Sequence, residues 1–176
     1  MGRSRIVRRL RWLRNWELFD VGLFLTLLVW WVTARDPSTW LLTAFGVSLV
    51  CYLLLQGGFY WHLKAQAVAS RSGRLPAYFC GLFTHLRYSS LVLLACFPLI
   101  VVSARTVNST TLSELLRSSA IVAFAALEYV NYYHYQLMHD TVNDLRYLKM
   151  HRRLRRAPLA DDLARCHSKR VQRTER

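Results

Sequence analysis

Long apolar blocks, separated by short stretches that hold most of the arginines, constrain this chain more than any other feature. Each block is close to the ~20 residues that an α-helix needs to cross ~30 Å of hydrocarbon at ~1.5 Å per residue. The blocks are residues 16–34, 39–62, 85–103 and 113–139. The pattern predicts an all-α integral membrane bundle of four transmembrane helices. TLSE, at 111–114, has the spacing of a capping box at the start of the fourth helix.

The positions of the basic residues predict how the bundle is oriented. Of the 24 lysines and arginines, 21 lie in the N-terminal segment, in the C-terminal tail, or between the second and third blocks, counting Arg87. Positive charge is enriched on the cytoplasmic side of membrane proteins, so we expect both termini in the cytoplasm. This gives a basic segment over 1–15, a transmembrane domain over 16–139, and a basic tail over 140–176 that is helix-permissive as far as Pro158. The expected location is the bacterial inner membrane.

The net charge of +14 raises the question of a nucleic-acid partner. The arginines flank apolar blocks instead of forming one basic domain, which argues against nucleic acid and favours anionic lipid headgroups. The predicted headgroup contacts are Arg8, Arg9, Arg11, Arg152, Arg153, Arg155 and Arg156. The four cysteines form no CxxC pair, and we expect them to be small buried hydrophobes without disulfides.

The fourth block ends in LEYVNYYHYQLMHD (127–140), which is too polar for a helix surrounded by lipid. On a helix of ~100° per residue, its polar residues share one face about 100° wide. This predicted intramembrane stripe consists of Glu128, Asn131, Tyr132, Tyr135 and His139. The same wheel puts Tyr133 on the opposite, lipid-facing side. A carboxylate at this depth costs ~2.5–3.5 kcal/mol, so Glu128 should face the bundle interior.

The second block supplies the expected partner for the stripe. Gln56 is deep enough to face Glu128, and we include it in the polar intramembrane stripe. Gly57 and Gly58 follow it and would allow neighbouring helices to approach closely.

Four histidines are predicted to lie near the cytoplasmic membrane surface, namely His62, His85, His134 and His139. Neutral imidazoles beside carboxylates suit a metal ion or a haem. The HxxxxH spacing of His134 and His139 sets their rings ~140° apart on a helix, which argues against a shared metal. No cofactor is favoured, and a metal- or haem-dependent redox enzyme stays an alternative.

A purely structural role explains the same residues. Glu128, Asn131 and Gln56 would then form hydrogen bonds between helices, worth on the order of 1 kcal/mol each. Histidine and tyrosine also favour the headgroup boundary without any ligand. The catalytic motifs of common hydrolases and nucleotide-binding proteins are absent from the sequence.

The stretch EYVNYYHYQL, together with the basic HRRLRR and the ADDL that follow it, resembles small multi-spanning membrane proteins of bacteria, some of which carry a general stress-protein label. The resemblance covers residues 60–62 and 128–163. It implies a membrane location and brings no particular activity or catalytic residue.

Three classes of function follow from the sequence. The first is a small polytopic membrane protein that acts by binding anionic lipid, another membrane protein or a second copy of itself. The second is the metal- or haem-dependent enzyme described above. The third is a path for protons or small solutes through Glu128, because an ionisable residue inside a membrane is often functional.

Overall fold

The computed structural model describes residues 2–33, 40–70, 73–107, 110–138, 146, 149–150 and 153–174. Within this part of the chain the structure is helical, apart from short connections and one isolated antiparallel bridge between Tyr135 and Arg156. The helices are α1 (Arg3–Thr33), α2 (Leu41–Ala69), α3 (Phe79–Val107), α4 (Leu112–Tyr133) and α6 (Pro158–Thr174). The predicted all-α class is confirmed for the described residues.

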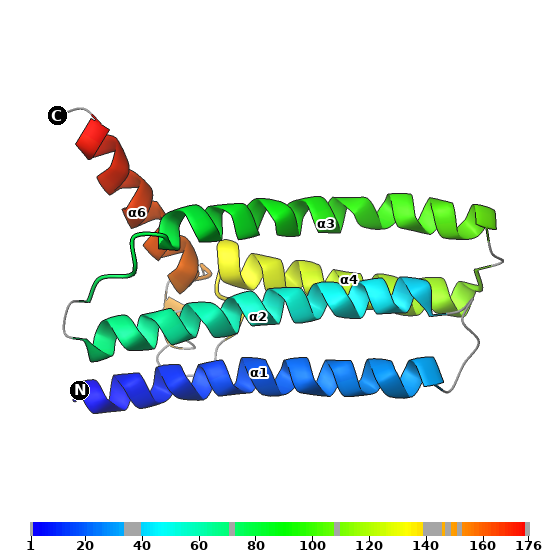
Figure 1. Cartoon of the computed structure of the whole chain (residues 1–176), viewed down its shortest axis with the longest axis horizontal. Coiled ribbons are helices and arrows are strands. Elements are labelled where there is room, and N and C mark those ends of the chain that lie inside the picture. Colours follow the sequence, from blue (N-terminus) through cyan, green and yellow to red (C-terminus); the bar gives the residue numbers. More distant parts are fainter. Residues whose placement is uncertain are drawn as a thin grey trace.

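Helices α1 to α4 lie side by side and alternate in direction, and α6 crosses one end of this bundle (Figure 1). The start of α1, the end of α2, the start of α3 and the end of α4 all lie at the α6 end. We call residues 3–20, 52–69, 79–92 and 125–133 the α6-proximal half. The α6-distal half consists of residues 21–33, 41–51, 93–107 and 112–124.

Three of the described helices are long and apolar enough to cross a membrane, namely α1, α2 and α3. With 31 and 29 residues, α1 and α2 are ~46 and ~43 Å long, which matches a bilayer with its headgroups. Helix α4 has 22 residues and contains Glu114, Arg117 and Glu128, which lower its mean hydropathy. A fourth crossing by α4 stays a prediction.

The helices differ from the predicted spans at their ends. Helix α1 begins at Arg3, well before residue 16, because its arginine-rich first turns form good helix although they are too polar for hydrocarbon. Helix α4 ends at Tyr133, so Tyr135 is not part of it. The side chain of Asn131 explains this end, since its Oδ1 accepts hydrogen bonds from the backbone N–H of Leu137 at 2.9 Å and of Met138 at 3.4 Å.

Helix α2 forms the centre of the bundle. Sixteen of its 29 residues are buried, whereas α1 buries Leu10 and Val21 among its 31. Helix α2 packs directly against α1, α3 and α4. Large apolar side chains face outward on the surrounding helices, for example Phe19 on α1 (60% exposed) and Leu99 on α3 (67% exposed). Such a surface suits a lipid environment, where apolar exposure is not penalised.

The C-terminal tail folds back onto the bundle. Helix α6 begins at Pro158, where we expected helix-forming sequence to end, because proline is well tolerated in the first turn. Its Leu159 and Leu163 are buried in the main core cluster. The expectation that no cysteines are paired is wrong, because a disulfide joins Cys80 on α3 to Cys166 on α6. The two are 86 residues apart, so their spacing carries no signal of the bond.

Candidate functional site

Tyr132 on α4 reaches across α2 to α1. Its hydroxyl donates a hydrogen bond to Oε2 of Glu17 at 2.6 Å, and the side chain is 5% exposed. The ring passes over Gly57, where an added Cβ would lie 2.5 Å from Cζ and 2.6 Å from Cε1 of Tyr132. Any larger residue at position 57 would displace the ring. Because Gly57 has no side chain, the Tyr132 side chain can cross α2 at this position and contact α1.

Gln56 is buried at the junction of three helices. Its Oε1 accepts a hydrogen bond from the Tyr133 hydroxyl on α4 at 2.6 Å, and its Nε2 donates to Ser90 Oγ on α3 at 3.0 Å. Ser90 in turn donates to the Leu86 carbonyl at 2.8 Å. The partner that we expected for Gln56 was Glu128. The structure instead pairs it with Tyr133, the residue that the helical wheel placed toward lipid.

Further tyrosines complete a set of cross-helix contacts in the α6-proximal half. The Tyr129 hydroxyl accepts a hydrogen bond from Arg87 Nε at 3.4 Å, and its ring centroid lies 5.1 Å from that of Tyr133. The hydroxyls of Tyr52 and Ser89 are 2.7 Å apart. The last turns of α4 thus bond to α1 through Tyr132, to α2 through Tyr133 and to α3 through Tyr129. Tyr132 and Gln56 are the members of the predicted stripe that take part, and both join one helix to another.

The other members of the predicted stripe that the structure describes make local hydrogen bonds, within α4 and the segment that follows it. Glu128 is half-buried and accepts a hydrogen bond from Asn131 Nδ2 at 3.3 Å. Tyr135 follows the end of α4 and is 51% exposed. Gln136 N–H donates to the Arg155 carbonyl at 2.8 Å, which ties this segment to the chain before α6. His139 lies outside the described residues.

Three carboxylates come together between α1 and α4. Glu17 is the one bonded to Tyr132, and the negative charges of Glu128 and Asp20 act on it. Asp20 lies one turn from Glu17 on the same face of α1. Glu17 and Asp20 were absent from the predicted stripe. Acidic residues at the edge of an otherwise apolar block were the available signal, because such residues need a polar partner.

The predicted histidines face different neighbours. Nδ1 of His62 lies 3.3 Å from Arg14 Nη1, and its Nε2 lies 3.1 Å from Gln66 Nε2. His85 is exposed on α3. His134 follows α4, with its ring centroid 5.6 Å from that of Tyr129. Among the described residues, no three His, Cys, Asp or Glu side chains are placed to hold a metal ion.

Asp162 on α6 docks the tail onto α2. Its Oδ2 accepts a hydrogen bond from the Tyr60 hydroxyl at 2.8 Å and forms an ion pair with Lys64. The Asp162 side chain is 10% exposed, so water screens this contact weakly. The ADDL segment noted in the sequence is thus a docking element, although neither Asp162 nor Lys64 was predicted to be part of a site.

Arginines gather at the α6 end of the bundle. Arg8, Arg9 and Arg11 are exposed on α1, and Arg153, Arg155 and Arg156 are exposed before α6, while Arg152 lies outside the described residues. Arg156 Nε is 3.4 Å from Asp161 Oδ1. The predicted headgroup contacts that the structure describes therefore lie at one end of the molecule.

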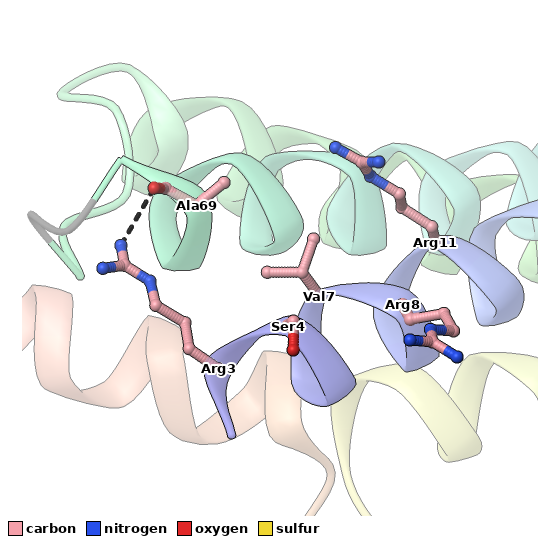
Figure 2. A pocket seen from close by; sticks show the side chains of 6 residues that line it. All are labelled: Arg3, Ser4, Val7, Arg8, Arg11 and Ala69. Carbon is pink, nitrogen blue, oxygen red and sulfur yellow. Dashed lines mark hydrogen bonds between the residues drawn. The ribbon is translucent and has the colours of Figure 1, made fainter.

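A hollow of about 580 Å³ opens between the first turns of α1 and the last turn of α2. Figure 2 shows its lining residues, which are Arg3, Ser4, Val7, Arg8, Arg11 and Ala69. Arg3 turns toward α2, where it donates to the Val68 carbonyl from Nε at 2.6 Å and to the Ala69 carbonyl from Nη2 at 2.9 Å. These bonds satisfy carbonyls at the C-terminal end of α2. Arg8 and Arg11 form the rest of the basic lining.

No family model, curated protein or solved structure matches this chain.

Proposed function

We propose that the chain is a polytopic membrane protein that acts by binding, and that its α6 end contacts anionic lipid headgroups at the cytoplasmic face of a bacterial inner membrane. The observation that carries the proposal is the gathering of exposed arginines at one end of a bundle whose outer surface is apolar. Each Lys or Arg near an anionic leaflet contributes about 1 kcal/mol to attraction. Other membrane proteins, or a second copy of the chain, would meet the exposed apolar faces of α1 and α3.

Lipid analysis of the extracted protein tests this proposal. The full chain is extracted from membranes of phosphatidylcholine and phosphatidylglycerol as a polymer-bounded disc, and the lipid in the disc is quantified. We expect phosphatidylglycerol to be enriched over the bulk membrane, and the enrichment to fall as salt rises because the Debye length shortens. A disc with the bulk composition at every salt concentration would refute the proposal.

The orientation has a separate test. A single cysteine is placed at Ser168 on α6, in a chain whose native cysteines are replaced by serine, and right-side-out cells are treated with an impermeant maleimide. We expect no labelling until the membrane is opened, since the arginine-rich end should face the cytoplasm. Labelling of intact cells would reverse the proposed topology.

A proton or small-solute path through Glu128 is a second candidate, favoured by the grouping of Glu128 with Glu17 and Asp20. The Glu128→Gln variant keeps the hydrogen-bonding shape and removes the charge. If the path exists, liposomes with the wild-type protein should dissipate a pH gradient faster than liposomes with this variant. Equal rates for wild type, variant and empty liposomes would exclude proton conduction.

A further inference from the structure

Two arginines on α1, Arg8 and Arg11, line the hollow. Among the residues that the structure describes, the guanidinium groups of Arg8 and Arg11 have no hydrogen bond or ion pair. They lie three residues apart, so they are neighbours on the helix surface. Ser4, one turn before Arg8, adds an exposed hydroxyl to the same lining. The site offers two positive charges and one hydroxyl to an anion.

The depth of the hollow matches the lipid headgroup layer. Helix α1 is ~46 Å long, close to the ~40–45 Å of a bilayer that includes both headgroup layers. Its first turn and a half, as far as about Arg8, would therefore lie among headgroups, and the long side chain of Arg11 extends back toward that layer. Trp12 and Trp16 follow directly, as expected for side chains at the boundary with hydrocarbon.

An exposed aromatic track leads from the arginines toward the membrane centre. Arg8, Trp12, Trp16 and Phe19 recur at intervals of four, four and three residues, and thus share one face of α1. The three aromatic rings pack edge to face. The ring centroids are 5.7 Å apart between Trp12 and Trp16 and 5.6 Å apart between Trp16 and Phe19. All three rings are about half exposed or more. An acyl chain extended along this track would contact each ring.

We propose that this face of α1 binds one anionic phospholipid, with its phosphate between Arg8 and Arg11 and an acyl chain along Trp12, Trp16 and Phe19. This inference rests on the proposed function and narrows it from general attraction to a single site. A soluble phosphate would use the arginines but gain nothing from the aromatic track. Val7 and Ala69, which also line the hollow, suit the glycerol backbone of a lipid better than a free anion.

Native mass spectrometry of the full chain in detergent, titrated with dioleoylphosphatidylglycerol, tests the site. The Arg8→Gln/Arg11→Gln variant should bind the first lipid on the order of tenfold more weakly, because two charge contacts are lost. Arg146→Gln/Arg165→Gln is the matched control, since it removes the same charge from exposed positions outside the predicted headgroup contacts. We expect its affinity to stay within about twofold of wild type.

Two further arms identify the ligand. Glycerol 1-phosphate should fail to displace the bound lipid, and full displacement would show a soluble phosphate site instead. Trp12→Ala/Trp16→Ala should weaken binding of the dioleoyl lipid but leave binding of the dihexanoyl lipid unchanged. An equal loss for both chain lengths would overturn the acyl-chain contact.

The outcomes separate this inference from the proposed function. If both arginine pairs weaken binding equally, the single site is refuted while general attraction to anionic lipid stands. If the wild-type protein binds phosphatidylglycerol no better than phosphatidylcholine, the proposed function itself fails. Size-exclusion chromatography of each variant confirms that a loss of binding is not a loss of fold.

Discussion

The two halves of the bundle satisfy their polar side chains in different ways. In the α6-proximal half, Tyr132, Tyr133 and Gln56 form hydrogen bonds to other helices. In the α6-distal half, hydroxyls mostly bond back to carbonyls of their own helix, as Thr26 does to Gly22 at 2.8 Å and Ser103 to Leu99 at 3.0 Å. Long side chains can span the gap between helices, whereas short hydroxyls compete for the nearest backbone group.

The α6-distal half is instead held mainly by packing. Gly46 lets Ile121 approach, and Phe45 stacks on Phe97 with centroids 6.2 Å apart.

Two polar contacts between helices that the structure describes in the α6-distal half lie near the end of the bundle. Arg117 sits 3.9 Å over the Trp31 ring, and Glu114 accepts a hydrogen bond from the backbone N–H of Leu42. Substitutions should therefore be felt more strongly in the α6-proximal half, where both shape and hydrogen bonds depend on the same residues.

The largest effect is expected at Gly57. An alanine there would push Tyr132 off α2 and break its bond to Glu17. Overpacking costs ~1–3 kcal/mol and a lost bond to a charged group adds to it, so the free energy of unfolding should fall by about 3 kcal/mol. Denaturation in mixed micelles, followed by circular dichroism, measures it. Gly22→Ala, with no atom within 4 Å of the new Cβ, is the control and should raise the free energy of unfolding by up to ~1 kcal/mol through helix propensity alone.

The second-largest effect is expected for the docking of α6 onto α2. Asp162→Asn removes the charge that pairs with Lys64, at an expected cost of about 1.5 kcal/mol to the docked state. Limited trypsin digestion, with a reductant present so that the Cys80–Cys166 bond does not mask the change, should cut α6 faster. The neighbouring Asp161→Asn loses a more exposed pair with Arg156 and should differ little from wild type. Equal digestion of both variants would contradict the docking role of Asp162.

Removal of one hydroxyl should have a smaller effect. Tyr132→Phe keeps the ring over Gly57 and loses the bond to Glu17, which should cost about 1 kcal/mol in a membrane environment. The same micelle denaturation measures it. Tyr135→Phe alters an exposed tyrosine beyond the end of α4 and serves as the control. A larger loss in the control would mean that the stripe continues past Tyr133.

The smallest effect is expected at Gly46 in the α6-distal half. An added Cβ would lie 3.0 Å from Ile121 Cγ2, a methyl that can shift by a few tenths of an ångström. The gain in helix propensity from glycine to alanine, ~1 kcal/mol, opposes this crowding. Gly46→Ala should therefore leave the free energy of unfolding within about 0.5 kcal/mol of wild type. A loss as large as that of Gly57→Ala would remove the distinction between the halves.

Apolar blocks and their arginine borders were enough to predict the positions of helices α1 to α4, because length and polarity are local properties of the sequence. Contacts between helices were harder to predict. The wheel placed Tyr133 toward lipid because it centred the buried face on Glu128, whereas the buried residues of α4, including Ser118, Tyr129 and Tyr133, share a face to one side of Glu128. The capping box formed in part, since Thr111 accepts a hydrogen bond from Glu114 N–H at 3.3 Å. The Glu114 carboxylate reaches the start of α2 instead, which local spacing could not reveal.

The docking of the tail onto α2 could not be predicted from the sequence either. Asp162 looked like part of a solvated basic segment, and its partners Tyr60 and Lys64 are about a hundred residues away. Such pairs form only when folding brings distant segments together. Neither composition nor hydrophobic periodicity indicates which segments will meet. The arginine-rich end, in contrast, was predicted from position alone, and the hollow lined by Arg8 and Arg11 adds a shape to that prediction.

The passage of Tyr132 over Gly57 also bears on the order in which the protein is made. Helices α1 and α2 are consecutive and pack together directly, so their hairpin can form as soon as both have left the ribosome. Until residue 132 has been synthesised, that hairpin carries Glu17 without its tyrosine donor and an open notch at Gly57. The arrival of α4 fills the notch and supplies the donor in one event. Helix α4 therefore completes the packing of the first two helices during synthesis. A chain that ends before α4 would keep Glu17 without its tyrosine donor.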